Sequence, residues 1–263
     1  MNEYNNTPPA ESRAAHNEAA PPPERLPFGP WATVLIGAAL LLIIELIGAN
    51  LAVLSMMISA QVRGAPMPED TAELVETGRF VAAMQPFKVV LAAAAMAVLA
   101  LVCKLPWSSY YGRWGFTWRQ AGVWLLGMIL LLGGSALGLW SLGRPTVLDW
   151  VISVYQTAGW MPFFAVALCV LAPLYEELFF RGFLIRGLEQ SRLGATGGVV
   201  LSAAVWAAIH VQYPVEGIVI IFVMGIFLGA AWVRTRSLGL VIMLHGAANA
   251  VSLAQTAYVA AGQ

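Results

Sequence analysis

Residues 31–60 read WATVLIGAALLLIIELIGANLAVLSMMISA, an apolar run whose only charged residue is Glu45. A helix rises about 1.5 Å per residue, so about 20 residues cross the roughly 30 Å hydrocarbon layer of a membrane. Comparable apolar runs follow at about 84–103, 122–142, 161–186, 197–212, 215–233 and 238–260. We therefore predict an all-α polytopic transmembrane helical bundle of about seven spans, with room for an eighth within 31–60 or 143–160.

The composition excludes an ordinary water-soluble domain. Of the 263 residues, 59% are hydrophobic and 11% are charged, whereas soluble domains average about 45–50% and about 25%. Basic and acidic residues balance at 14 each, so no basic field favours nucleic acid as a partner. We expect the lipid bilayer to be the main environment of the chain.

Three regions differ in composition. Residues 1–30 are rich in Pro, Asn, Glu and Ala, and such a segment cannot bury enough apolar surface to offset the entropy of ordering. We predict a disordered cytoplasmic tail there, followed by N-terminal transmembrane helices in 31–160 and a transmembrane core in 161–263. The tail lacks the pattern of a secretory signal.

The basic residues between the runs predict an orientation. Cytoplasmic loops carry an excess of Lys and Arg. A cytoplasmic N-terminus leaves Arg63, Arg79 and Arg144 outside, with Lys88 near the membrane boundary, and places seven basic residues inside: Lys104, Arg113, Arg119, Arg186, Arg192, Arg234 and Arg236. We therefore expect an integral protein of the cytoplasmic (inner) membrane.

Charged side chains within the runs indicate where function lies, because burying a charge in lipid is costly. The segment PLYEELFFRGFL, from Pro173, holds Glu176, Glu177 and Arg181. Glu177 and Arg181 are four residues apart, so they share a helix face and can pair. Glu176 is rotated by about 100° from Glu177. We expect the pair to be architectural and Glu176 to be free for chemistry. Glu45 is expected to be structural or to line a substrate path.

Two histidines lie within predicted spans. These are His210, in VWAAIHVQY, and His245, in MLHGAANA; Trp206 precedes His210 by four residues, and Asn249 follows His245 by four. Counted from the inner ends at about 1.5 Å per residue, Glu176, His210, His245 and Asn249 lie about 10–20 Å deep. We predict that these four meet in one pocket, with Trp206 as a wall.

Two chemistries suit such a pocket. A carboxylate beside an imidazole can take a proton from water, and a second His with an Asn can stabilise an oxyanion, which suits amide hydrolysis. Alternatively Glu176, His210 and His245 could bind a divalent metal such as zinc. The sequence lacks the His-Glu-x-x-His and Gly-x-Ser-x-Gly patterns, so neither a motif-bearing zinc protease nor a serine hydrolase is indicated.

Small residues recur at a spacing of four in two runs. Gly225 and Gly229 form one pair, and Gly134 and Gly138 form another. Such pairs allow helices in membranes to approach closely. We expect close helix packing at both pairs.

In order, Glu176-Glu177-x-x-x-Arg181, the aromatic Trp206 four before His210, Phe222-x-x-Gly225-x-x-x-Gly229 and His245-x-x-x-Asn249 resemble the four motifs of the CPBP family. These are the CAAX proteases and bacteriocin-processing enzymes, also called the Abi family, which are intramembrane proteases. The resemblance covers about residues 161–252. The family usually has Phe where this chain has Trp206.

The resemblance implies an endopeptidase that cleaves membrane-associated or lipidated peptides or proteins. It implies that Glu176 activates water with help from His210, while His245 and Asn249 form the oxyanion-stabilising or metal-binding side. Glu177 and Arg181 would be architectural. The resemblance leaves both a glutamate-dependent and a metal-assisted mechanism open. It also allows a non-catalytic scaffold or immunity-type protein, while a small transporter lacks support because no inverted repeat is evident.

Overall fold

The computed structural model describes residues 27–65, 71–106 and 111–262. Most of the predicted disordered tail, residues 1–26, lies outside them. The described residues form helices and no strand beyond an isolated bridge between Arg113 and Ser237. The elements are α2 (Pro30–Val62), α3 (Thr71–Val75), α4 (Gly78–Val102), α6 (Trp118–Ser141), α7 (Asp149–Gln156), α8 (Met161–Val166), η1 (Ala167–Leu171), α9 (Ala172–Glu177), η2 (Leu178–Ile185), α10 (Arg186–Glu189), α11 (Gly194–Ala208), α12 (Val215–Thr235) and α13 (Leu238–Ala261).

Within the described residues, six helices are long and apolar enough to cross a membrane. They are α2, α4, α6, the continuous segment from α8 to α10 (Met161–Glu189), α12 and α13. The remaining apolar run forms α11, whose 15 residues extend only about 22 Å. The all-α multispan bundle is thus confirmed, with six candidate spans and one shorter apolar helix. The regions with room for an eighth span hold the single helix α2 and the eight-residue α7.

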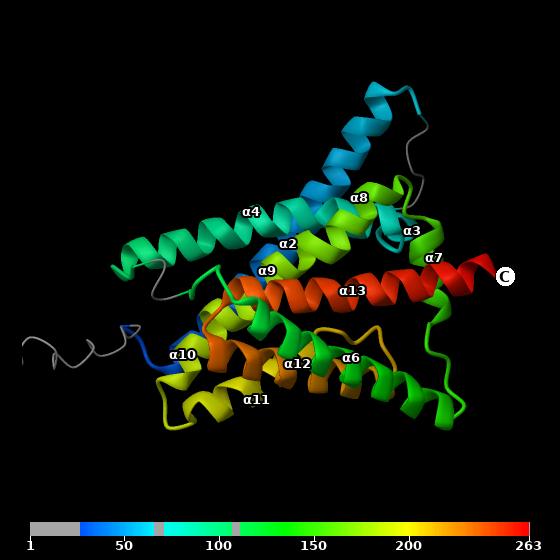
Figure 1. Cartoon of the computed structure of the whole chain (residues 1–263). Helices are drawn as coiled ribbons and strands as arrows, with labels where there is room; N and C mark the ends of the chain where they lie inside the picture. The colour runs from blue at the N-terminus through cyan, green and yellow to red at the C-terminus, as the bar shows by residue number, and fades with distance from the viewer. Residues whose placement is uncertain (1–26, 66–70, 107–110, 263) are drawn as a thin grey trace, which may run out of the picture.

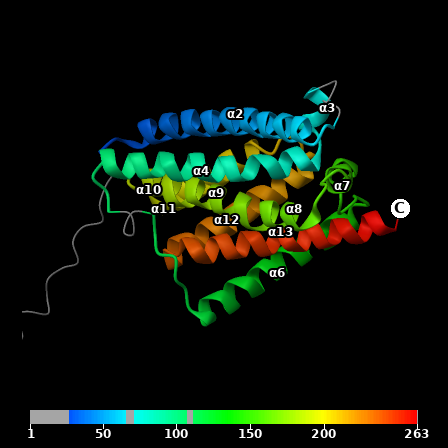
Figure 2. The same ribbon diagram turned by 90° about the horizontal axis from the view of Figure 1, so that it is seen from above.

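The helices lie roughly along one direction. In Figures 1 and 2, α2 and α4 lie side by side on one side of the bundle, and the segment from α8 to α10 runs between them and α12 with α13. Helix α6 lies at the opposite edge of the bundle (Figure 2), and 6% of its most apolar 18-residue stretch is buried. The expected packing at Gly134 and Gly138 is therefore wrong, because a Cβ at either position would meet no described atom within 4 Å.

The other glycine pair packs as predicted. A Cβ on Gly225 would lie 2.9 Å from the Cβ of Ala203, and one on Gly229 would lie 2.8 Å from Cγ1 of Val199. Only residues without a side chain allow α12 this close to α11. The pair therefore holds α11 firmly in the bundle, although α11 is too short to span.

Basic residues from three of the predicted inner loops lie at one end of the bundle. Arg236 pairs with Glu189 at 2.9 Å, and Arg186 pairs with the same carboxylate at 2.6 Å. The backbone N–H of Arg113 donates to the carbonyl oxygen of Arg236 at 3.0 Å. These contacts join the ends of α6, α10 and α12.

The segment that carries Glu176 is not a regular α-helix. Two π-helical stretches, η1 and η2, flank the short α9, and such wide turns are frequent at functional sites. In η1 the N–H of Ala172 bonds to the carbonyl of Ala167, five residues back. The next carbonyl, on Leu168, would need an N–H from Pro173, and proline has none. An acceptor is therefore left open on the side of this segment.

Helix α13 supplies the missing donor. The amide Nδ2 of Asn249 donates to the carbonyl oxygen of Leu168 at 2.8 Å. Gly246 permits the approach, because a Cβ there would collide with the carbonyl oxygen of Cys169. The proline in one helix and the glycine in the other thus set the distance between the two helices that carry the candidate site.

Candidate active site

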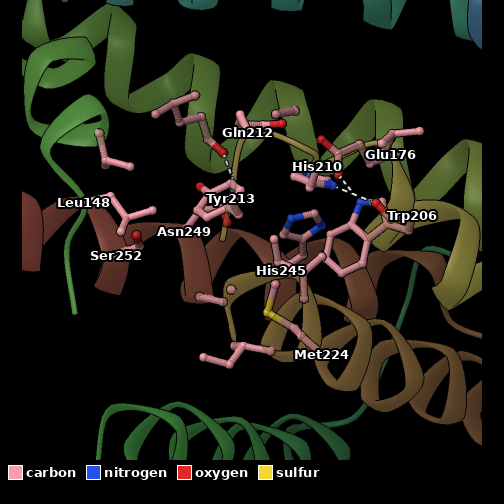
Figure 3. Close-up of a pocket in the computed structure, with 18 of the residues that line it drawn as sticks. Leu148, Glu176, Trp206, His210, Gln212, Tyr213, Met224, His245, Asn249 and Ser252 are labelled. Atoms are coloured by element: carbon pink, nitrogen blue, oxygen red, sulfur yellow. Dashed lines mark hydrogen bonds between the residues drawn. The ribbon is translucent and has the colours of Figure 1, made fainter. Parts of the chain in front are cut away.

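Trp206, near the end of α11, connects three of the four predicted residues. Its indole Nε1 donates to Oε2 of Glu176 at 2.6 Å. Its ring lies edge-on to the rings of His210 and His245, with centroids 5.4 and 5.3 Å away, as Figure 3 shows. The predicted aromatic wall is present, and it also orients the carboxylate. A Phe, which the CPBP motif usually has here, offers no such donor.

Glu177 holds His245 as well as Arg181. Its side chain is fully buried, and its Oε1 accepts from Nη1 of Arg181 at 3.0 Å, which confirms the predicted pair. The same oxygen lies 2.8 Å from Nδ1 of His245. An ionised carboxylate only accepts hydrogen bonds, so Nδ1 carries the hydrogen and the opposite nitrogen, Nε2, is left for other partners. The contact with His245 joins residues 68 apart, and no local spacing indicates it.

His210 lies outside any helix, contrary to its predicted place within a span. Helix α11 ends at Ala208, and His210 belongs to the connection between α11 and α12. Its Nδ1 lies 2.7 Å from the carbonyl oxygen of Trp206. A carbonyl only accepts, so Nδ1 again carries the hydrogen and Nε2 is available. The early end of α11 lets this connection reach Glu176 within the bundle.

The four predicted residues line one cavity of about 1540 Å³. Asn249 enters it from α13, one turn beyond His245; in Figure 3 His245 lies next to Trp206, and Asn249 lies next to Tyr213. The predicted convergence of Glu176, His210, His245 and Asn249 is thus what the structure shows.

Tyr213 is a cavity residue that the sequence analysis missed. Its ring lies 6.1 Å from that of His210 and 5.2 Å from that of Trp150. Burial, together with the nearby Glu176 carboxylate, raises the pKa of Tyr213 above its usual value, so its hydroxyl stays a hydrogen-bond donor. An aromatic residue three positions after a candidate His was the available signal.

A second polar group lies on the cavity wall. Nζ of Lys88 lies 2.7 Å from Oε1 of Glu45, and the hydroxyl of Tyr175 donates to the same oxygen at 3.1 Å. Lys88 is ten residues into α4, or about 15 Å, so its predicted place near the membrane boundary is wrong. The predicted alternatives for Glu45, a structural role or a place beside a substrate path, agree with its position.

The predicted metal ligands do not fit a metal in this arrangement. Within the described residues, no group of three or more His, Cys, Asp or Glu side chains is placed to hold one ion. Nδ1 of His245 and of His210 are both engaged, which would suit ligands that bind through Nε2. However, Glu176 is turned to Trp206. We therefore derive no chemical step through a metal.

The part of the chain that carries the site is similar to a known family. Residues 158–251 match the family model described as Type II CAAX prenyl endopeptidase Rce1-like. Comparisons with curated proteins and with solved structures gave no match. The matched range contains every residue of the cluster around Trp206, from Glu176 to Asn249. Residues 158–251 are therefore similar to an Rce1-like CAAX protease domain, which is consistent with the CPBP family, and they lie within a bundle of helices long and apolar enough to cross a membrane.

Proposed function

We propose that this protein is an intramembrane endopeptidase in which Glu176 activates the water that cleaves a peptide bond. The observation that carries the proposal is the arrangement around Trp206. One carboxylate and two imidazoles line a common cavity, and each is fixed by a hydrogen bond on the side away from its reactive atom. The match to a CAAX protease family supports peptidase activity in general.

Glu176 is the general base. Its Oε2 accepts from the indole of Trp206, which leaves Oε1 to take a proton from water. The hydroxide so formed attacks the carbonyl carbon of the scissile bond, and the proton then passes to the departing amide nitrogen. His210, with Nδ1 held by the backbone, presents Nε2 to orient the water.

His245 and Asn249 stabilise the developing oxyanion. Glu177 fixes the ring of His245 through Nδ1, so Nε2 donates to the oxyanion when the ring is protonated. Asn249 uses one amide hydrogen on Leu168, and its second amide hydrogen is directed to the substrate. Donors fixed before the reaction stabilise charge without reorganisation, and removing one typically lowers kcat by about 10²–10³-fold.

The cavity suits a substrate that comes from the membrane. Its walls are mainly aliphatic, with residues from α2, α6 and α12 facing the polar group. An apolar cavity of this kind gains free energy by covering apolar substrate surface. We propose membrane-associated or lipidated peptides and proteins as substrates, with the bilayer as the other partner.

We propose further that the protein lies in the cytoplasmic membrane with its N-terminus in the cytoplasm. The cluster of Arg113, Arg186 and Arg236 at one end of the bundle supports this orientation, because basic residues favour the cytoplasmic face. No nucleic acid partner is proposed.

The test is cleavage by the purified protein in detergent. The probe is a quenched fluorogenic peptide that ends in a farnesylated Cys-aliphatic-aliphatic-X sequence. Glu176→Gln should abolish turnover and leave the melting temperature unchanged. Glu216→Gln is the matched control, because Glu216 also lines the cavity but pairs with the exposed Arg144 at 2.9 Å; it should retain activity.

Two outcomes decide between the remaining alternatives. Turnover that survives Glu176→Gln would overturn the assignment and favour the scaffold or immunity-type role. The metal alternative, with Glu176, His210 and His245 as ligands, predicts loss of activity with a chelator and recovery with zinc. The glutamate-dependent mechanism predicts activity that is insensitive to both.

A further inference from the structure

The ion pair between Glu45 and Lys88 has no part in the mechanism above. It lies in the middle of two candidate spans, about 15 Å into α4, and it lines the same cavity as Glu176. Tyr175, which precedes Glu176, contacts both members: its hydroxyl donates to Glu45, and Nζ of Lys88 lies 4.5 Å from the centre of its ring. The pair is therefore fixed beside the general base.

Stability alone does not account for this pair. An ion pair in a poorly solvated place contributes little compared with apolar residues of similar size, and ionisable residues inside membrane spans commonly mark functional paths. The side chain of Glu45 is also 38% exposed, while that of Lys88 is 11% exposed. An acid that serves only to neutralise Lys88 has no need to face the cavity.

The contacts leave hydrogen-bonding capacity on both partners. Lys88 and Tyr175 both reach Oε1 of Glu45. Within the described part of the chain, no hydrogen bond reaches Oε2. An ammonium has three donors, and one of those on Lys88 is directed at Glu45. The pair thus offers one free acceptor and free donors side by side on an otherwise apolar wall.

Charge decides which ligand fits. The pair is neutral, the pair of Arg144 and Glu216 at the cavity edge is neutral, and the base Glu176 adds one negative charge. A substrate carboxylate would add a third negative charge to those of Glu45 and Glu176 around Lys88, and a substrate cation would pair with the base. A neutral peptide group, with one N–H and one C=O, avoids both costs.

A peptide group entering the membrane also needs such partners. Backbone N–H and C=O groups without hydrogen bonds are costly in hydrocarbon. We infer that Glu45 and Lys88 bind the backbone of the substrate peptide on one side of the scissile bond, Glu45 accepting from an amide N–H and Lys88 donating to a carbonyl oxygen. These are positioning residues, and the inference rests on the proposed function.

The test uses the double variant Glu45→Leu/Lys88→Met, because Lys88→Met alone leaves an unpaired acid and Glu45→Gln would keep a hydrogen-bond acceptor. With the farnesylated fluorogenic peptide, KM should rise about tenfold, as for the loss of charge-assisted hydrogen bonds, while the maximal kcat stays that of the wild type. Arg144→Met is the matched control, because it removes the basic partner of the other cavity ion pair, and its KM should not change. An unchanged KM in the double variant, or a loss of kcat without a rise in KM, would overturn the inference.

Modified peptides identify the contact itself. Replacing amides near the scissile bond by esters, one at a time, removes one N–H each. One position should raise the wild-type KM about tenfold and leave the KM of the double variant unchanged. If no position distinguishes the two proteins, the inference is wrong. C-terminal amidation should not affect KM, and a large increase would show that Lys88 binds a carboxylate instead.

Failure of the proposed function can be recognised separately. Binding of the same peptide can be measured by fluorescence anisotropy in the Glu176→Gln background, where no turnover is expected. Adding Glu45→Leu/Lys88→Met should raise Kd about tenfold, whether or not the wild-type protein cleaves the peptide. An unchanged Kd refutes backbone binding even if Glu176 proves essential.

Discussion

Glu177 is the residue at which stability and activity can be separated. Its Oε1 is shared by Arg181 and His245. Oε2 of Glu177 and Nε of Arg181 are buried without a hydrogen-bond partner among the described residues. Glu177→Gln leaves the guanidinium of Arg181, which is 1% exposed, without its counter-ion. Breaking a buried pair from one side costs about 3–5 kcal/mol, so we expect a marked loss of thermal stability.

The double variant Glu177→Leu/Arg181→Met should recover most of that stability. Buried ion pairs replaced by apolar residues of similar volume are often neutral or stabilised, and this pair is joined by a single contact rather than two. However, His245 then has no acceptor for Nδ1. In metal sites, loss of the residue that orients a ligating His lowers metal affinity or activity by about 10–100-fold. We expect kcat to fall by a similar factor here.

Unfolding in detergent and cleavage of the farnesylated peptide, measured on the same preparations, check both parts. Glu177→Gln should lower both the thermal stability and the rate of cleavage. Glu177→Leu/Arg181→Met should lower the rate of cleavage and keep most of the stability. A double variant as active as the wild type would refute the idea that Glu177 orients His245. A double variant as unstable as the single one would show instead that the ion pair itself stabilises the bundle.

Two further predictions concern the contact between α13 and the segment that carries Glu176. Asn249→Ala should destabilise the protein by about 1 kcal/mol, because the half-buried Leu168 carbonyl loses its hydrogen-bond donor. In a Pro173→Ala background, which restores an N–H, the loss in unfolding free energy should be clearly smaller, and equal losses in both backgrounds would contradict the explanation. Gly246→Ala should destabilise the protein by about 1–3 kcal/mol through overpacking, as measured by thermal unfolding. The control Gly134→Ala, whose Cβ meets open space, should be neutral or stabilising by up to about 1 kcal/mol. A neutral Gly246→Ala would contradict the clash.

Much of the fold follows from the length of the apolar runs. Each run became a helix, because a backbone in hydrocarbon must satisfy its own hydrogen bonds. The run at 197–212 was predicted to be a span, yet α11 ends at Ala208 and the chain turns through His210. Hydropathy does not show this early end, since Ile209 and Val211 are as apolar as the helix before them.

Helix spacing predicted the local pairs and missed the distant ones. Glu177 and Arg181 follow from their separation of four residues, and so does the shared face of His245 and Asn249. The contacts of Glu177 with His245 and of Lys88 with Glu45 join different helices. These depend on which helices are neighbours and on their depth in the bundle. Charges within apolar runs were still the right signal, because an isolated charge in lipid requires a partner.

Pro173 shows how one residue connects sequence, packing and site. It removes a backbone donor at the second residue of α9 and leaves the carbonyl of Leu168 open. Asn249 fills that acceptor, so the same side chain that is proposed to stabilise the oxyanion also fixes α13 against the helix of the general base. Substitutions of Asn249 should therefore lower stability and kcat together, whereas substitutions of His210, whose described contacts come from its own chain segment, should lower kcat alone.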